Sequence, residues 1–343
     1  MSNRELHGRI ARCDELKKAV GGELVSRVLL LLSVLLFSGI SLAQYPSRPV
    51  KLVLGFAPGG AADFVSRTLQ EPLARSLGQP IIVENKPGAG SSIAAESVAR
   101  SAPDGYTLLI ASPSSILVNP LIAPRPGFDP RRDLVTVSKV SASPLVVAAH
   151  TSVGVSTLRE LIAYAKKHPG KLNYASSGQG AAPHLAAVLF TRLAGVDLVH
   201  VPYKGGGPAV QSLIAGDTQL SFATPPSVLP HVQSGHLRAL AVTSRERTPL
   251  VSGVPGMAEA GLPEYEISFW YGFFLPAGTP PAIVKRLFDA AVTALAQPQV
   301  GQAFAKEGTE ISGSRSPEEF NAFLSEDAKL WTRLVKESGV KAE

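Results

Sequence analysis

The sequence predicts an α/β protein of two lobes, each built on a mainly parallel sheet. The chain has 343 residues, which is long for one ordinary domain and sufficient for two α/β domains with sizeable cores. A unit made of a short apolar run, a loop of small residues and an amphipathic segment occurs several times along it. Two longer apolar runs, at residues 134–149 and 267–275, can each carry the chain from one lobe to the other.

The composition indicates a folded protein that does not bind nucleic acid. Hydrophobic residues make up 45% of the chain and charged residues 17%, which is typical of globular proteins. The formal net charge is +6, but lysine and arginine are scattered along the chain and form only short pairs. A nucleic-acid-binding face needs them clustered.

The first 43 residues have the pattern of an export signal. Basic residues precede an apolar run at 28–37, and the small residues Ser41 and Ala43 stand where a signal peptidase reads. We therefore predict cleavage after Ala43. The alternative is an uncleaved anchor, but residues 28–43 fall short of the roughly 20 apolar residues of a spanning helix. Cleavage removes Cys13, the one cysteine of the chain, so we expect neither a disulfide nor thiolate chemistry.

The first lobe begins with strands and helices in alternation, which implies a parallel sheet. The expected strands are residues 50–54, 81–84 and 107–111, and the expected helices between them are residues 62–77 and 93–100. Pro72 should kink or restart the first helix, because proline has no N–H to donate. A proline-rich surface segment at 120–130 follows.

The second lobe repeats this alternation. Thr157 and Glu160 form a capping box for a helix that ends at Lys167. Further strands are expected at residues 172–176, 198–202, 219–224 and 237–243, and the first three of them are each followed by a loop and a helix. Pro183 suits the first turn of the helix after the first of these strands.

The two crossings divide the chain. It leaves the first lobe along the run at 134–149, which Pro144 interrupts, and it returns along the run at 267–275. The first lobe is therefore built from both ends of the chain. We place residues 1–43 in the signal peptide, residues 44–143 and 268–343 in lobe 1, and residues 144–267 in lobe 2.

The loops that follow the strands are the predicted binding site. Residues 52–63 read L-V-L-G-F-A-P-G-G-A-A-D, so a strand ends at a Pro-Gly-Gly turn and a helix begins. The first N–H groups of such a helix are unpaired and point outward, and this arrangement binds anions. The same arrangement occurs after the strands that end at 176, 202 and 224. Since these loops contain little arginine, we expect backbone N–H groups and water to hold an anion.

Small and hydroxyl-bearing residues in these loops are the first candidates for binding. Glycine lets the backbone approach a ligand closely, and the candidate glycines are Gly59, Gly60, Gly178 and Gly180. Gly59 and Gly60 could instead serve only to turn the chain. Ser177 and Thr224, each at the end of a predicted strand, are the hydroxyl candidates.

Four other side chains in the loops each have an alternative explanation. Lys204 could pair with a distal carboxylate or be an ordinary solvated lysine. His184 could bind a ligand, or it could cap or pack. Phe56 could be a wall of the cleft or part of the core. Asp63 lies in the first helical turn, where a carboxylate stabilises the helix dipole without any ligand.

The sequence gives little sign of catalysis. Ser177 and His184 could be a nucleophile and its base, but no G-x-S-x-G elbow surrounds the serine and no acid is placed to orient the histidine. Metal-binding spacings such as H-E-x-x-H are absent from the sequence, and G-A-G-S-S at 88–92 lacks the Walker lysine and the Rossmann spacing. We therefore expect no enzyme activity, no metal and no cofactor.

Six motifs occur in a fixed order along the chain. They are G-F-A-P-G-G-x-x-D at 55–63, V-E-N-K-P-G-A-G at 83–90, P-D-G-Y-T-L-L at 103–109, H-V-P-Y-K-G at 200–205, L-R-A-L-A-V-T at 237–243 and P-A-G-T-P at 276–280. Together they resemble the Bug family, the extracytoplasmic solute-binding receptors of tripartite tricarboxylate transporters. The resemblance covers nearly all of the chain after the signal. It implies a type II-like periplasmic-binding-protein fold, with a ligand cleft between two lobes that two crossing strands join.

The resemblance also implies a function. Such a receptor lies in the periplasm, captures one small carboxylate and delivers it to membrane permease subunits; the ligand is a di- or tricarboxylate, an amino acid or an aromatic acid. In the family, the aspartate that matches Asp63 faces the cleft and accepts from an amino or hydroxyl group of the ligand. We expect a monomer. One alternative is a sensor that passes its closed form to a signalling protein, and a less favoured one is a serine-dependent hydrolase.

Overall fold

The computed structural model describes residues 45–122, 128–338 and 340. The predicted signal peptide and its cleavage site after Ala43 lie outside the described residues. Residues 48–343 form a compact unit, to which both sheets belong. Among the described helices, none has the length and apolar character that crossing a membrane requires.

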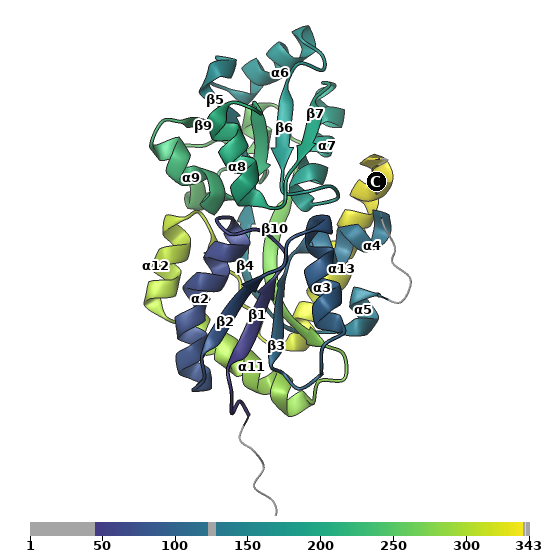
Figure 1. The fold of residues 1–343 in the computed structure, drawn as a ribbon. Coiled ribbons are helices and arrows are strands. Elements are labelled where there is room, and N and C mark those ends of the chain that lie inside the picture. The colour runs from purple at the N-terminus through teal and green to yellow at the C-terminus, as the bar shows by residue number, and fades with distance from the viewer. Residues whose placement is uncertain (1–44, 123–127, 339, 341–343) are drawn as a thin grey trace, which may run out of the picture. The chain divides into compact units, whose positions relative to one another are not determined.

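Lobe 1, as we define it here, consists of a six-stranded sheet and the helices that pack on it (Figure 1). The strand order is β11-β4-β10-β3-β1-β2. The strands are β1 (Val50–Leu54), β2 (Ile81–Asn85), β3 (Thr107–Ala111), β4 (Leu134–Pro144), β10 (Ser268–Pro276) and β11 (Glu310–Ile311).

Lobe 2 consists of a five-stranded sheet and its helices. The strand order is β7-β6-β8-β5-β9. The strands are β5 (Val146–His150), β6 (Asn173–Ser176), β7 (Val199–Pro202), β8 (Leu220–Ala223) and β9 (Leu237–Val242). The predicted two-lobed α/β architecture is confirmed.

Both sheets are mixed, and this corrects the prediction of mainly parallel sheets. Strand β1 pairs in parallel with β2 and β3, and β6 pairs in parallel with β7 and β8. The remaining pairs are antiparallel, including β10 with both β3 and β4. The reason is that β4 leaves lobe 1 while β10 returns to it, so the two connecting strands run in opposite directions and pair with each other.

The connection out of lobe 1 is direct. Strand β4 ends at Pro144 and β5 begins at Val146 in the other sheet. The predicted lobe limits at 143/144 and 267/268 stay a prediction, although the sheets change at these places along the chain.

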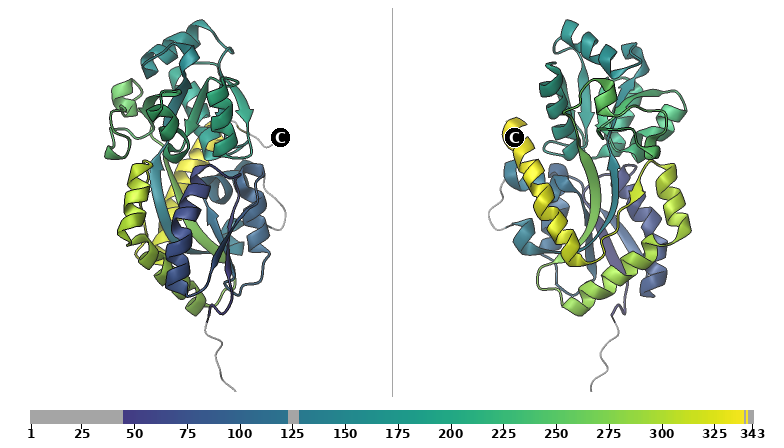
Figure 2. Two further views of the ribbon diagram at one scale, coloured as in Figure 1. Left: turned by 60° about the vertical axis from the view of Figure 1, so that its left-hand side comes forward. Right: turned by 180° about the vertical axis from the view of Figure 1, so that it is seen from behind.

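The helices of lobe 1 pack on both sides of its sheet (Figures 1 and 2). Helix α2 packs against α11, and α13 packs against β4. The helices are α2 (Ala61–Leu77), α3 (Ser92–Ala99), α4 (Asn119–Ile122), α5 (Pro130–Asp133), α11 (Pro281–Leu295), α12 (Pro298–Lys306) and α13 (Pro317–Ser338). A π-helical turn at Ser114–Val118 follows β3.

Helix α2 continues through Pro72 as one element, so it does not restart there, and the alternative of a kink stays a prediction. Proline removes one hydrogen bond from the helix. The same helix buries Leu69, Leu73 and Leu77 on one face, and burial of each leucine stabilises the fold by roughly 1.5–3 kcal/mol. This burial offsets the lost bond.

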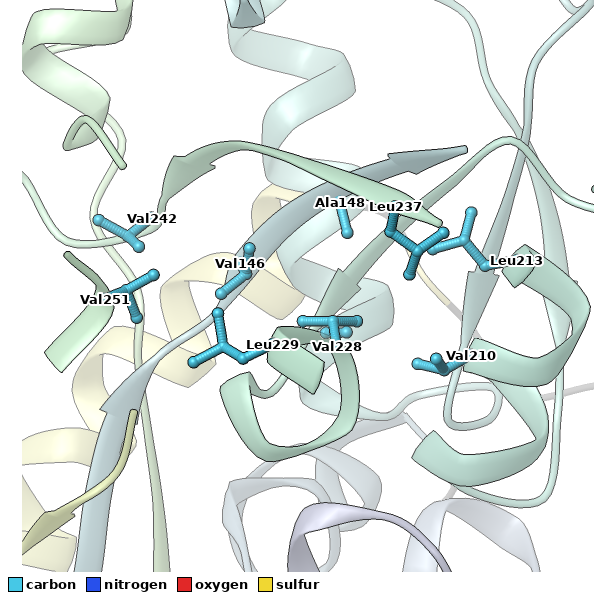
Figure 3. Packing of buried hydrophobic residues seen from close by; sticks show 10 residues of the cluster. Val146, Ala148, Val210, Leu213, Val228, Leu229, Leu237, Val242 and Val251 are labelled. Atoms are coloured by element: carbon cyan, nitrogen blue, oxygen red, sulfur yellow. The ribbon is translucent and has the colours of Figure 1, made fainter. Parts of the chain in front are cut away.

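The helices of lobe 2 are α6 (Leu158–Lys167), α7 (Ala182–Ala194), α8 (Gly206–Ala215), α9 (Pro225–Gln233) and α10 (Met257–Ala260). The predicted cap of α6 is confirmed, because Thr157 accepts a hydrogen bond from the Glu160 N–H at 3.2 Å. The lobe 2 core joins β5 to α8 and α9 (Figure 3). Val146 and Ala148 of β5 belong to one buried cluster with Leu213 of α8 and Val228 of α9. This packing fixes where both helices begin relative to the sheet.

A polar contact inside lobe 1 ties β10 to α13. The indole N–H groups of Trp270 and Trp331 both donate to Asp327 Oδ2, at 2.7 and 2.9 Å. Burial raises the pKa of Asp327, and the two indole bonds and the charge of Lys139 lower it by less. Both tryptophans are buried, so this contact holds a connecting strand to the C-terminal helix.

Candidate functional site

A cavity lies where loops of the two lobes meet. It encloses about 30 Å³, which is room for roughly two water molecules. Lobe 1 lines it with Phe56, Gly60, Ala61, Ala62, Phe269 and Tyr271, and lobe 2 lines it with Ser177, Pro183, Gly206, Ala209, Ser221, Phe222, Ala223 and Thr224. The walls are therefore aromatic rings and small residues, with four hydroxyl-bearing side chains among them.

Four helices begin at this cavity, and in none of them does the side chain of the N-cap residue cap the helix. The N-cap residues are Gly60 of α2, Ala181 of α7, Gly205 of α8 and Thr224 of α9, and no side chain of these residues accepts from the helix start. The first N–H groups of a helix carry a partial positive charge and need acceptors. Proline occupies the first two positions of α9 and the second position of α7, and the first N–H of α7 donates to Ser114 Oγ at 2.9 Å. The starts of α2 and α8 are therefore the ones that favour an anion at this place.

The cavity walls contain no charged side chain among the described residues that line it. Their polar side-chain groups are neutral. Ser221 Oγ donates to the Ala175 carbonyl at 3.0 Å, and Thr224 Oγ1 lies 3.0 Å from Ser227 Oγ. Burial raises the pKa of Tyr271, and a hydrogen bond from the Ala62 amide lowers it by less, so this phenol stays protonated next to the start of α2. Any anion here meets dipoles and hydroxyl groups.

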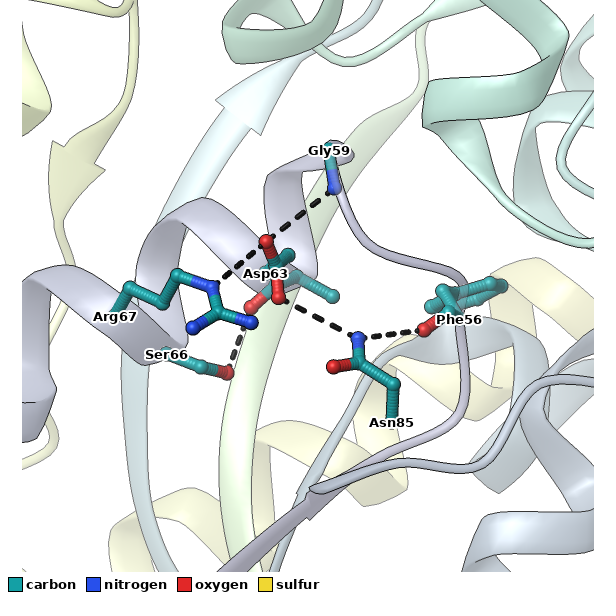
Figure 4. Close-up of polar contacts among 7 residues, drawn as sticks. Phe56, Gly59, Asp63, Ser66, Arg67 and Asn85 are labelled. Carbon is teal, nitrogen blue, oxygen red and sulfur yellow. Dashed lines mark hydrogen bonds and ion pairs between the residues drawn. The ribbon is translucent and has the colours of Figure 1, made fainter. Parts of the chain in front are cut away.

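Asp63 is directed at its own loop (Figure 4). Its Oδ2 accepts from Arg67 Nε at 2.9 Å and from the Gly59 N–H at 3.3 Å, and its Oδ1 accepts from Asn85 Nδ2 at 3.4 Å. Burial raises the pKa of Asp63, but the hydrogen bonds from Arg67, Gly59 and Asn85 together lower it further, so the net pKa lies below the usual value. The carboxylate is therefore ionised and holds the loop between β1 and α2. It is not among the residues that line the cavity.

In lobe 2, two histidines hold the loop between β6 and α7. The rings of His184 and His200 stack with centroids 3.9 Å apart, and Tyr174 stacks on His200 at 4.9 Å. His184 Nδ1 accepts from the Gly180 N–H at 3.1 Å, and His200 Nε2 lies 2.6 Å from Ser176 Oγ. Burial lowers the pKa of His184 to about 3, with a smaller contribution from His200, and burial lowers the pKa of His200 to about 4. Both rings are therefore neutral at physiological pH.

This arrangement differs from the serine–histidine pair considered in the sequence. Ser176 rather than Ser177 contacts a histidine, and that histidine is His200 rather than His184. Ser176 is 1% exposed and its hydroxyl also accepts from the Gly178 N–H. These contacts support the loop. Within the part of the chain that the structure describes, no three histidine, cysteine or acidic residues gather as a metal site.

The loop after β7 touches the loop after β1. The Ala57 N–H donates to the Lys204 carbonyl at 2.9 Å. The Lys204 side chain is exposed, so the contact uses only its backbone. Across the same contact, Gly59 and Gly60 face Gly207. Close approach here requires residues without side chains.

Of the predicted site residues, the structure brings Phe56, Gly60, Ser177 and Thr224 to the cavity wall. The others lie in the surrounding loops and first helical turns and do not line it; they are Gly59, Asp63, Gly178, Gly180, His184 and Lys204. The sequence reasoning missed Ser221, Phe222, Phe269 and Tyr271. One signal was present for Ser221, a lone polar residue in the apolar run L-S-F-A. The ring-bearing residues gave none, because strand residues alternate between faces and only the structure shows which face meets the cavity.

Comparisons with known proteins show the family of this chain and support its fold. A model of the tripartite tricarboxylate transporter family receptor matches residues 65–340. BugT of Bordetella pertussis is 38% identical over 303 residues, which are 88% of this chain and 93% of BugT.

Solved structures match over similar lengths. A protein of R. palustris solved with adipate is 32% identical with a TM-score of 0.83, over 87% of this chain and 99% of that one. MatC from Rhodopseudomonas palustris, with bound malate, is 33% identical with a TM-score of 0.80, over 85% of this chain and all (100%) of MatC. These likenesses confirm the predicted periplasmic-binding-protein fold. As the resemblance predicted, the chain belongs to the tripartite tricarboxylate transporter family receptors, a family of periplasmic solute-binding proteins.

Proposed function

We propose that this protein binds one small carboxylate in the cavity between its lobes and presents it to the membrane subunits of a tripartite tricarboxylate transporter. The observation that carries the proposal is the meeting of the starts of α2 and α8, whose N-cap glycines provide no capping side chain, at an uncharged cavity. Helix N–H groups bind a carboxylate through directed hydrogen bonds as well as through the dipole. The relatives solved with adipate and malate support this class of ligand.

The neutral walls suit a ligand that must be released again. A lysine or arginine in a cavity would form a salt bridge with any anion. N–H and hydroxyl groups instead stabilise only a carboxylate that is placed at hydrogen-bond distance. The rings of Phe56, Phe222 and Phe269 line the rest of the cavity, and they would contact the carbon chain of the ligand. We propose that Gly60, Ser177 and Thr224 bind the carboxylate group at the polar end of the cavity.

The lobes must separate to admit a ligand. A cavity of about 30 Å³ is too small for a dicarboxylate, which displaces several water volumes. Strands β4 and β10 connect the lobes, and rotation about such connections is the usual hinge motion of two-lobed proteins. Export to the periplasm, with a signal peptide cleaved after Ala43, belongs to the same proposal.

The test is calorimetric titration of the purified protein, refolded to remove carried-over ligand, with di- and tricarboxylates, amino acids and aromatic acids. We expect one class of acid to bind. We propose that the Ser221 hydroxyl turns from the Ala175 carbonyl to the carboxylate when the acid binds. In the variant Ser221→Ala, we therefore expect affinity for that acid to fall by roughly tenfold, which corresponds to about 1.4 kcal/mol.

Ser66→Ala is the matched control. Ser66 is as buried as Ser221 and also donates to a backbone carbonyl, that of Ala62 at 2.7 Å, but it does not line the cavity. Both variants should lose similar stability, and only Ser221→Ala should lose affinity. Equal affinity losses, or a folded wild-type protein that binds no acid, would contradict the proposal.

A further inference from the structure

The two lobes meet through glycines at the rim of the cavity. Gly59 and Gly60 end the loop after β1, and Gly206 and Gly207 begin α8. A Cβ atom added to Gly60 would lie 3.3 Å from Gly207 N, and one added to Gly59 would lie 3.9 Å from Gly207 Cα. The neighbouring hydrogen bond from Ala57 to the Lys204 carbonyl, at 2.9 Å, joins the same two loops. The lobes are thus in direct backbone contact.

Gly207 is a position at which this contact tolerates no side chain. A Cβ atom there would lie 2.5 Å from the Pro58 carbonyl oxygen and 3.1 Å from Gly59 C, both backbone atoms of lobe 1. Carbon and oxygen atoms that are not bonded attract best at about 3.5 Å and repel steeply when closer. A methyl group on residue 207 therefore cannot be accommodated unless the lobes move apart.

Gly206 provides the contrast. A Cβ atom there would meet Ser227 Oγ at 3.1 Å, a side-chain atom of the same lobe, and Gly60 Cα only at 3.7 Å. Neither Gly206 nor Gly207 is among the glycines with a positive φ, so alanine suits the backbone at both positions. The two glycines therefore differ in the atoms that an added methyl group would meet.

The contact also borders the cavity, because Gly60 and Gly206 both line it. The distance between the loops therefore sets the room for a ligand. We propose that Gly207 is a specificity-determining residue, which lets the lobes approach each other more closely around a ligand than a side chain there would allow and so favours short dicarboxylates over longer ones. This rests on the proposed function, since it names the ligand length that the same cavity selects.

The first experiment measures closure without any ligand. The Ala57 amide is bonded across the lobes, so its hydrogen exchange, followed by NMR, reports directly on their separation. We expect exchange at Ala57 to be at least about tenfold faster in Gly207→Ala than in the wild type and unchanged in Gly206→Ala. Protection of Ala57 in Gly207→Ala equal to that of the wild type would overturn the proposal.

The second experiment measures selectivity by calorimetry with malonate, succinate, glutarate and adipate. In Gly207→Ala we expect the shortest acid that the wild type binds to lose affinity by roughly tenfold or more, and each longer acid to lose less. The added methyl group of Gly60→Ala makes a milder contact, and this variant should shift the affinities in the same direction. It replaces Gly207→Ala in the test if Gly207→Ala folds poorly. Gly301→Ala is the control: it makes the same change in α12, where the nearest atom is Ile311 Cδ1 at 3.7 Å, and should leave all affinities unchanged.

The outcomes separate the two proposals. A wild-type protein that binds none of these acids and no acid of the wider panel would overturn the proposed function, and the length preference with it. Normal wild-type binding with the same loss for every length in both Gly207→Ala and Gly60→Ala would overturn the role of Gly207 alone.

Discussion

The loops on the two sides of the cavity are held in place by different chemistry. In lobe 1, the loop between β1 and α2 is held by an ionised carboxylate, Asp63, and by its partner Arg67, whose side chain is 53% exposed. In lobe 2, the loop between β6 and α7 is held by a buried stack of neutral rings, His184 and His200, with a hydrogen bond from Gly180. One support is ionic and partly open to solvent, and the other is uncharged and enclosed.

The difference predicts separate responses to pH. A histidine whose folded pKa is depressed contributes stability that is complete above its unfolded pKa of about 6.5 and is lost as pH falls below that value. A carboxylate whose folded pKa is depressed contributes stability that is complete above about pH 4 and is lost only below it. Between about pH 4 and 6.5, therefore, only the lobe 2 loop is weakened.

The largest effect should come from His200→Ala. The change removes the bond to Ser176 and both ring contacts, and it leaves a cavity beside Tyr174. We expect the free energy of unfolding in urea to fall by about 3 kcal/mol. His236→Ala is the control, because that ring is exposed and its hydrogen bond is to Ser234, a side chain that is also exposed. A loss below about 1 kcal/mol would mean that the stack does not support the loop.

The second effect is the pH dependence itself. The unfolded chain takes up a proton at His184 and at His200 below about pH 6.5, while the folded protein resists it because both pKa values are depressed, to about 3 and about 4. The free energy of unfolding should therefore fall by up to roughly 1.4 kcal/mol per pH unit for each histidine as pH falls from 6.5 toward 4.

Urea denaturation at several pH values measures this slope. His184→Gln keeps a polar side chain that cannot be protonated, so we expect its slope to be shallower than that of the wild type. The same slope in both proteins would show that the stacked rings are not the source of the acid sensitivity.

A smaller effect is expected from Asp63→Asn on the ionic side. The change removes the charge that pairs with Arg67 but keeps an oxygen that can accept from the Gly59 N–H. We expect a loss of about 1 kcal/mol in low salt, because the exposed guanidinium is already screened by water, and a smaller loss at high salt. Asp289→Asn, which breaks the exposed pair with Lys285, is the comparison and should cost less. A loss that does not change with salt would contradict the ionic account.

The smallest expected effect concerns the loop after β2. This loop sharpens the comparison because it is held neither by the Asp63 carboxylate nor by the histidine stack. Ser91 has a φ of 79°, a left-handed conformation that is rare outside glycine, and its buried hydroxyl has no hydrogen-bond partner. Ser91→Gly relieves both costs and should raise the free energy of unfolding by about 1 kcal/mol. Ser91→Ala removes only the hydroxyl and should gain less. A destabilised Ser91→Gly protein would show that the serine makes a favourable contact.

Much of the fold could be predicted from the sequence because local signals agreed. The apolar runs gave strands β1, β6 and β8 nearly to the residue, and the Thr157 capping box gave the start of α6. The mixed sheets could not be predicted in this way. Strand direction in β10 depends on pairing with β3 and β4, which lie more than a hundred residues away in the chain, and no local pattern carries that information.

The candidate site was less predictable than the fold. The loops were found correctly as the places where helices begin, yet the direction of each side chain depends on tertiary partners. Asp63 lies one helical turn from Arg67 and turns to it, and His184 turns to His200, 16 residues further along the sequence. Tyr271 reaches the cavity from β10, a strand that the sequence marked only as a connection between the lobes.

The contact of both indoles with Asp327 has a practical consequence for every optical measurement on this protein. The chain has two tryptophans, and Trp270 and Trp331 both lie in lobe 1, on a single carboxylate oxygen. Their fluorescence therefore reports on one half of the molecule. If melting followed by tryptophan emission coincides with melting followed by circular dichroism, the lobes unfold as one cooperative unit. If the two curves separate, a ligand screen based on tryptophan emission reports on lobe 1 alone. A change confined to the histidine stack of lobe 2 would then not alter the measured fluorescence.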